Sequence, residues 1–276
     1  MPLAAFLLAF CSAFVHALWN TLLSRARDSE AATAVALVAG ALAFAPVAAL
    51  TWEISSRALP YLAASAVLEV GYFVLLAAAY ERGELSLIYP VARGSAPLLV
   101  ALFSVVLLGT RLHALTVVGV VLVAGGIVAV RGLAGAGGRH LTRALAIGAM
   151  IAAYTLFDKA GLRHAQALTY LELVVLPSAI VYPPLIARRK GRAALRAEVG
   201  GPAVVAGIAM FGAFALALAA IRLAPQPFVP GVQAIRETSV VIAVAAGALI
   251  LGEPVGRARA LGAIAVVAGV IALAGA

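Results

Sequence analysis

The run LIYPVARGSAPLLVALFSVVLLGTRL, residues 87–112, decides the fold, because it recurs 143 residues later as PGVQAIRETSVVIAVAAGALILGEPV, residues 230–255. This shift places Arg93 on Arg236, and it pairs three glycines of the first half of the chain with three of the second. One offset that carries an arginine and three glycines indicates an internal duplication. Both runs are apolar apart from a few positions and are long enough to cross a bilayer.

The composition indicates that the solvent of this chain is lipid. Of its 276 residues, 64% are hydrophobic and 11% are charged, whereas a soluble domain has about 25% charged residues. The formal charge of +9 is spread between apolar runs and does not form one patch, which indicates topology signals and headgroup contacts and argues against nucleic acid as a partner. A phosphate loop, a zinc-binding spacing and a nucleophile elbow do not occur in a suitable context. We therefore expect no cofactor, no metal and no enzymatic activity.

Ten apolar segments can be marked, and each is expected to be a helix because irregular backbone cannot face lipid. They run over residues 2–23, 31–51, 58–80, 85–108, 113–130, 144–160, 166–187, 199–221, 226–251 and 257–275. The predicted fold class is an all-α integral membrane protein with ten transmembrane helices in two inverted five-helix repeats. The predicted division is a first repeat over residues 1–131, a Gly-rich linker over 132–143 and a second repeat over 144–276.

A second, shorter match supports the duplication. HALWNTLLSR, residues 16–25, lies over YTLFDKAGLR, residues 154–163, at an offset of 138. Because five helices is an odd number, consecutive copies enter the membrane from opposite sides. That is the inverted-repeat plan of secondary transporters, in which the substrate site lies near the midplane between the repeats.

The sequence resembles the drug/metabolite transporter superfamily, specifically the EamA-type ten-helix transporters. The residues that carry the resemblance are HALWN at 16–20 and two similar repeat endings, LGTRLHALTVVGVVLVAGG at 108–126 and LGEPVGRARALGAIAVVAG at 251–269. The resemblance implies that the first four helices of each half surround a substrate cavity and that the fifth and tenth brace the halves. It also implies a multi-pass protein of a bacterial inner membrane. The family usually has a glutamate after the LG, as in Glu253, but the first half has Thr110 there.

Polar side chains inside the spans are the candidate site residues, because a charge in a span costs at least about 2.5 kcal/mol and such residues face a cavity or a partner. The substrate-binding candidates are Arg93, Arg236, Glu69, Tyr72, Tyr89, Trp19, Asn20, Gln233 and Glu237. The candidates for proton coupling are His16, Glu172 and Asp158. The alternatives are that the arginines snorkel or pair structurally, that the carboxylates only neutralise them, and that Trp19 belongs to an aromatic belt.

The pattern favours an alternating-access transporter, secondary-active or facilitative, for a small metabolite. Both signs of charge indicate an amino acid or another carboxylate-bearing solute, whose carboxylate would suit the planar fork of arginine. The alternative is a multidrug or organic-cation exporter, with the carboxylates binding the substrate and the aromatic rings supporting it. A membrane enzyme is disfavoured because no nucleophile and base converge in the sequence. The partners expected are the solute, the bilayer and, if transport is coupled, protons. The fused repeat makes a monomer sufficient, with a homodimer as the alternative.

Two arguments give opposite orientations. With the N-terminus inside, the cytoplasmic connections would hold five Lys and Arg residues and the opposite side thirteen, so the positive-inside rule favours both termini outside. The family resemblance favours cytoplasmic termini.

Overall fold

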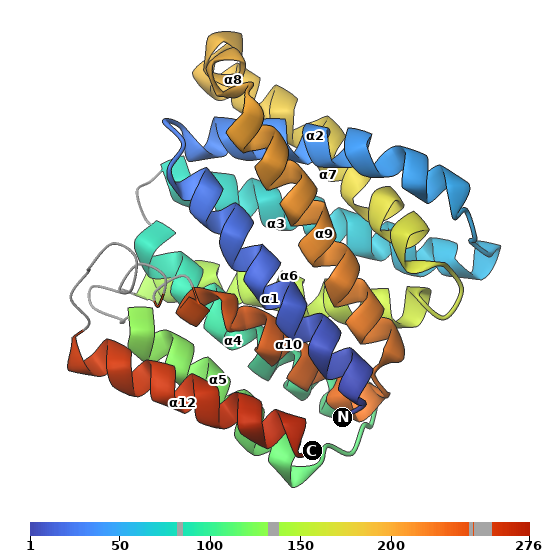
Figure 1. Ribbon diagram of the computed structural model, residues 1–276, viewed down its shortest axis with the longest axis vertical. Helices are drawn as coiled ribbons and strands as arrows, with labels where there is room; N and C mark the ends of the chain where they lie inside the picture. Colours follow the sequence, from blue (N-terminus) through green and yellow to red (C-terminus); the bar gives the residue numbers. More distant parts are fainter. Residues whose placement is uncertain (82–84, 132–137, 243–244, 246–255) are drawn as a thin grey trace.

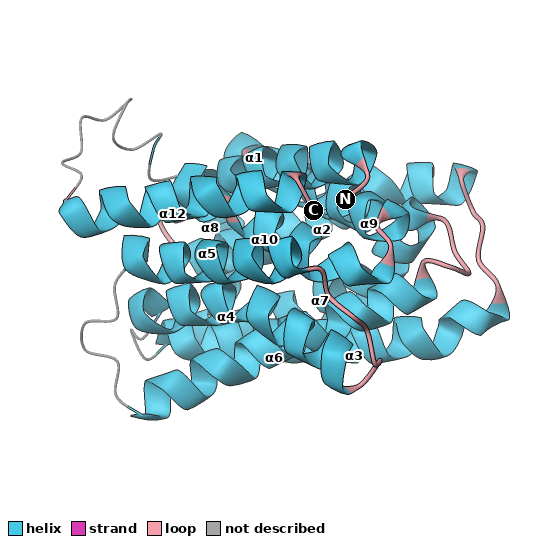
Figure 2. Cartoon of the chain, turned by 90° about the horizontal axis from the view of Figure 1, so that it is seen from below, coloured by secondary structure: helices cyan, strands magenta, loops and turns pink. Residues whose placement is uncertain are grey.

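The long apolar segments fold into helices, because lipid offers no partner for an exposed backbone N–H or C=O group. The helices of the first half are α1 (Leu3–Ser24), α2 (Ser29–Leu50), α3 (Leu59–Glu81), α4 (Leu85–Val106) and α5 (Ala114–Arg131). Those of the second half are α6 (Gly138–Gly161), α7 (Ala167–Lys190), the short α8 (Arg192–Glu198), α9 (Gly201–Leu223), α10 (Val229–Glu237) and α12 (Arg257–Ala274). The computed structural model describes residues 1–81, 85–131, 138–242, 245 and 256–276. Figure 2 shows a molecule built of helices that are joined by loops.

Nine of the ten predicted segments each correspond, within the described residues, to one helix of 18 to 24 residues. The remaining segment, 226–251, starts with the single turn η2 (Gln226–Phe228) and α10, and its later part lies outside the described residues. By length and hydropathy, six helices in the described part of the chain can cross a membrane: α1, α2, α3, α6, α7 and α9. The protein is therefore an all-α, multi-pass membrane protein, and the number ten stays a prediction.

The helix contacts follow the predicted duplication, which pairs α1 with α6, α2 with α7, α3 with α9, α4 with α10 and α5 with α12. Helix α1 packs on α9, and its counterpart α6 packs on α3. Helix α4 packs on α6, and its counterpart α10 packs on α1. Likewise α2 packs on α9 as α7 does on α3. Exchanging the two halves therefore leaves these interfaces in place, so the repeats are intertwined and do not form two separate bundles.

Helices α5 and α12 show that the repeats are inverted. They lie side by side at one edge of the molecule (Figure 1). A β-carbon at Gly119 would lie 2.8 Å from the carbonyl oxygen of Gly269, and one at Gly126 would lie 2.6 Å from that of Gly262. The order of these contacts is reversed along the two helices, so these equivalent helices run antiparallel. Only glycine allows the two backbones to approach this closely, so these residues form a small-residue seam.

Equivalent helices also begin in the same way. The side chain of Asp28 caps α2 by accepting hydrogen bonds from the backbone N–H groups two and three residues further on. The side chain of Gln166, 138 residues later, caps α7 with the same two contacts. Such caps satisfy donors that a helix start leaves without partners. The offset of 138 seen in α1 and α6 therefore continues into α2 and α7.

Candidate functional site

A cavity of about 370 Å³ lies between the two halves of the chain. Its wall comes from α1, α3, α4, α6 and α9, from the start of α2 and from the residues that follow α10. The volume falls within the range of roughly 300–1,000 Å³ that small-molecule sites have. Among the described residues, the wall contains five Phe, Tyr and Trp rings: Trp19, Tyr72, Phe73, Tyr154 and Phe214.

The two ends of the molecule differ. The cavity extends to Ser24 and Ser29, which flank the α1–α2 connection, and we call this end the open end. The other end, which contains the α6–α7 connection, is the closed end. There Ile54, from the α2–α3 connection, forms an antiparallel bridge with Ala165. This bridge is a backbone contact that helps to hold the closed end together. Neither of its two residues lines the cavity.

Arg93 lies at the cavity wall in a network that joins three helices. It is 3% exposed, and its Nε lies 2.8 Å from Oε2 of the fully buried Glu237. The other oxygen of Glu237 accepts a hydrogen bond of 2.8 Å from Nε2 of Gln233. Nη2 of Arg93 contacts Nε2 of His16. Because a guanidinium only donates, His16 accepts here as a neutral ring with its hydrogen on Nδ1. The network thus links α1, α4 and α10.

Arg236 does not occupy an equivalent environment, although the duplication pairs it with Arg93. Its Cζ lies 4.4 Å from the centre of the Phe214 ring, a cation–π contact. Phe214 lines the cavity and Arg236 does not. Its Nε and Nη2 have no hydrogen-bond partner among the described residues. The counterpart of Glu237 in the first repeat is Gly94, so the duplicated unit keeps the arginine but has an acid in one copy alone.

Two of the predicted carboxylates lie behind the cavity wall. Asp158 of α6 accepts a hydrogen bond from Ser65 of α3, with 2.5 Å between the oxygens. Glu69 lies one turn further along α3, is buried, and its Oε2 has no partner in the described part of the chain. Tyr154, one turn before Asp158 on α6, does line the cavity. Asp158 therefore lies in the α3–α6 interface, neither acid lines the cavity, and their roles stay predictions.

Trp19 and Asn20 of the predicted set are at the wall. The ring of Trp19 lies edge-on to His16, with 4.7 Å between the ring centres. Its indole Nε1 is buried and has no acceptor among the residues described. Asn20 donates from Nδ2 to the backbone oxygen of His16 at 3.0 Å. Trp19 thus offers a donor near Arg93, which argues against a simple aromatic-belt role.

The remaining predicted residues lie elsewhere. Glu172 is buried in the second turn of α7, toward the closed end, and does not line the cavity. The backbone of Tyr89 belongs to α4, but its side chain lies outside what the structure describes. Glu253, which carries the family resemblance, also lies outside the described residues.

Lys159 is a residue at the closed end that the sequence did not single out. Its buried Nζ donates to three backbone oxygens at the end of α9, those of Ile221 (2.8 Å), Arg222 (3.1 Å) and Ala224 (2.5 Å). The last carbonyls of a helix have no partner within the helix, and a lysine there also complements the helix dipole. Lys159 therefore ties the end of α6 to the end of α9. The counterpart of Lys159 at the open end is Thr21, which lines the cavity.

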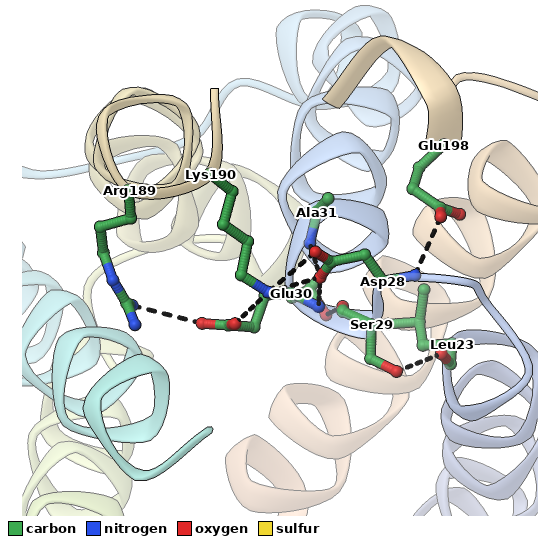
Figure 3. A network of polar contacts seen from close by, with 9 residues as sticks. Leu23, Asp28, Ser29, Glu30, Ala31, Arg189, Lys190 and Glu198 are labelled. Atoms are coloured by element: carbon green, nitrogen blue, oxygen red, sulfur yellow. Dashed lines mark hydrogen bonds and ion pairs between the residues drawn. The ribbon is translucent and has the colours of Figure 1, made fainter. Parts of the chain in front are cut away.

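A charged cluster lies beside the open end (Figure 3). Lys190 pairs with Asp28, at 2.8 Å, and with Glu30, and Arg189 lies 3.3 Å from Glu30. The backbone N–H of Asp28 donates to Glu198 of α8. Burial alone raises the pKa of Asp28, but the hydrogen bonds from Lys190 and from the start of α2 hold it below its ordinary value. The cluster fixes the α1–α2 connection to α7 and α8 at the rim of the cavity.

The comparisons with known proteins agree with this architecture. The model of the EamA-like transporter family matches residues 3–132 and again residues 141–275, one match for each half. No curated protein matches the chain. A solved structure, titled only "Crystal structure of protein", has a TM-score of 0.74 with 18% sequence identity over 97% of this chain and 94% of that one. That likeness shows a shared fold. Because the family model covers nearly the whole chain, the protein belongs to the EamA-like transporter family.

Proposed function

We propose that this transporter moves a small carboxylate-bearing solute, such as an amino acid, by alternating access through the cavity between its repeats. The observation that carries the proposal is the polarity of the wall. Among the described residues the wall contains the guanidinium of Arg93 and no carboxylate. Trp19 and Tyr154 also line the wall, and the buried indole N–H of Trp19 has no acceptor among the described residues. A wall rich in donors favours a solute rich in acceptors, and arginine binds a carboxylate in two-pronged geometry.

A second candidate, export of an organic cation, rests on the five aromatic rings of the wall, because such rings bind quaternary and protonated amines. The acid closest to the wall, Glu237, is already paired with Arg93. A cation in the cavity would therefore find no free carboxylate among the described wall residues to balance its charge. The same rings fit the apolar part of an amino acid equally well, so we prefer the carboxylate-bearing solute.

We further propose that the protein lies in the inner membrane of a bacterium and that its open end faces the cytoplasm. By chain order, the connections at this end carry thirteen of the Lys and Arg residues and those at the closed end five. The positive-inside rule then places the open end in the cytoplasm. The same proposal includes a division of the chain into repeats 1–131 and 144–276 with a linker at 132–143. It also includes a monomeric working unit and proton coupling through His16, Asp158 or Glu172.

Solute counterflow in proteoliposomes tests the proposal. The purified protein is reconstituted and offered a panel of amino acids, other organic carboxylates and lipophilic cations, each labelled outside and unlabelled inside. Counterflow confined to carboxylate-bearing solutes is the expected result. Counterflow of the lipophilic cations alone would establish the second candidate in its place.

A further inference from the structure

Glu237 forms an ion pair with Arg93, the one arginine of the cavity wall among the described residues, and it also accepts a hydrogen bond from Gln233. Both partners are buried, and their 2.8 Å contact joins α4 of one repeat to α10 of the other. Gln233, one turn earlier on α10, donates to the second oxygen of Glu237. The carboxylate is therefore oriented with one oxygen on Arg93 and one on a neutral amide. This is also the chemistry that a solute carboxylate would offer to Arg93.

The acid is not a remnant of the duplication. Its counterpart in the first repeat, Gly94, has no room for a large side chain, since a β-carbon there would lie 3.1 Å from Cγ2 of Val128 and 3.3 Å from the carbonyl oxygen of Ala124. The second arginine, Arg236, is stacked on a ring and has no acid of this kind. The chain thus pairs the arginine that faces the cavity with a carboxylate in direct contact, whereas Arg236 forms no such ion pair among the described residues and has only longer-range interactions with acids.

We infer that Glu237 is an internal counter-ion, which occupies Arg93 when the cavity is empty and is displaced by the carboxylate of the solute. The inference rests on the proposed function and names the step by which the site accepts its substrate. A displaced Glu237 would be a buried charge without its cation, which is strongly unfavourable. It avoids this by taking up one proton from the bulk solution through the water of the cavity, while the neutral acid keeps its contact with Gln233. One solute anion therefore binds together with one proton, and no net charge enters the site.

Several charged and titratable groups surround this pair, and each bears on its pH dependence. In the described part of the chain they are His16 of α1, Arg93 of α4, Tyr154 of α6 and Arg236 of α10. The sequence of α5, α9 and α12, which also pack against α10, has titratable side chains only within three residues of the helix ends. His16 is the group that could imitate Glu237, because a protonated His16 would also disturb Arg93. Any test must separate these two residues.

The test compares wild type with Glu237→Gln in counterflow of the carboxylate that wild type carries best, at several pH values. Wild type should bind this solute more tightly as the pH falls, by up to about tenfold per pH unit, the limit for one linked proton. Glu237→Gln should show a half-saturation concentration about tenfold or more below that of wild type at pH 7.5, and no dependence on pH. A folded Glu237→Gln protein with wild-type affinity or wild-type pH dependence would overturn the inference, the latter in favour of His16.

Controls keep the outcomes separate. Glu53→Gln makes the same chemical change at an exposed side chain outside the cavity, and should behave as wild type. If Glu237→Gln does not fold because Arg93 is left without its anion, the double variant Arg93→Gln/Glu237→Gln removes both charges and should fold. It should then lose carboxylate binding, and wild-type affinity in it would also overturn the inference. Absence of carboxylate transport in wild type would instead refute the proposed function.

Discussion

Replacing Lys159 with methionine should release the closed end of the molecule. Methionine keeps the length of the side chain but removes the ammonium that donates to three carbonyl oxygens at the end of α9. At the open end the counterpart residue, Thr21, bonds to the backbone of its own helix, and the ends of α1 and α3 line a cavity. Lys159 thus adds to the backbone bridge between Ile54 and Ala165 a side-chain contact that the open end lacks at Thr21.

The size of the effect follows from the contacts. Two of the three carbonyls that Lys159 binds belong to buried residues, Ile221 and Ala224, and a buried polar group that loses its partner costs about 1–3 kcal/mol. The loss is offset in part because a buried ammonium no longer has to be desolvated. A net change of about 3 kcal/mol corresponds to roughly a hundredfold shift toward the conformation that is open at this end.

Thiol labelling measures this shift. Leu218 is buried on α9, little more than one turn before the carbonyl groups that Lys159 binds. In a background where Cys11 is replaced by serine, Leu218→Cys should react slowly with a water-soluble maleimide, and Lys159→Met should speed the reaction by roughly a hundredfold. Arg57→Met, which removes an exposed cation at the same end of the molecule, should have no effect. An unchanged rate in a Lys159→Met protein that elutes as a folded monodisperse species would refute the reasoning.

Two further predictions concern stability. Gly126→Leu should destabilise the protein by about 1–3 kcal/mol or more, because a β-carbon there already lies 2.6 Å from the carbonyl oxygen of Gly262; thermal unfolding in detergent measures this, and an unchanged midpoint would contradict the glycine seam. The depressed pKa of Asp28 means that its contacts with Lys190 and the start of α2 stabilise the fold above about pH 4 and are lost as the pH falls through its folded value. Asp28→Asn should therefore be less stable than wild type at pH 7 and lose less stability on acidification to pH 3, and parallel losses in the two proteins would contradict this.

Local patterns in the sequence predict most of the helices. Each apolar segment is about as long as a bilayer is thick and is bounded by polar residues. For this reason the predicted bounds lie close to those of the observed helices at most ends. The inverted relation follows from the odd number of segments per repeat. It is also visible in the glycine seam of α5 and α12, where glycines that recur at one offset are the ones that make contact.

The partners inside the site could not be predicted in the same way. The spacing of Arg236 and Glu237 shows that adjacent residues of a helix point in different directions, but the partner of Glu237 depends on which helix packs against α10. Lys159 lies near the end of its helix, where a lysine usually reaches headgroups. The signal that could have identified it is the end of α9, whose carbonyls require a donor. A stripe of polar residues on a helix therefore indicates a protein-facing side and not a cavity, as Asp158 and Glu69 show.

The most direct test of the account is carboxylate counterflow by the variant Arg93→Gln in proteoliposomes, beside wild type and Arg236→Gln. The wall of the cavity predicts that Arg93→Gln is inserted and folded but carries no carboxylate-bearing solute, because the remaining wall residues in the described part of the chain include no cation. Arg236→Gln, which alters a residue behind Phe214, should retain more of the transport. Carboxylate counterflow at the wild-type rate in the folded Arg93→Gln protein would contradict the account.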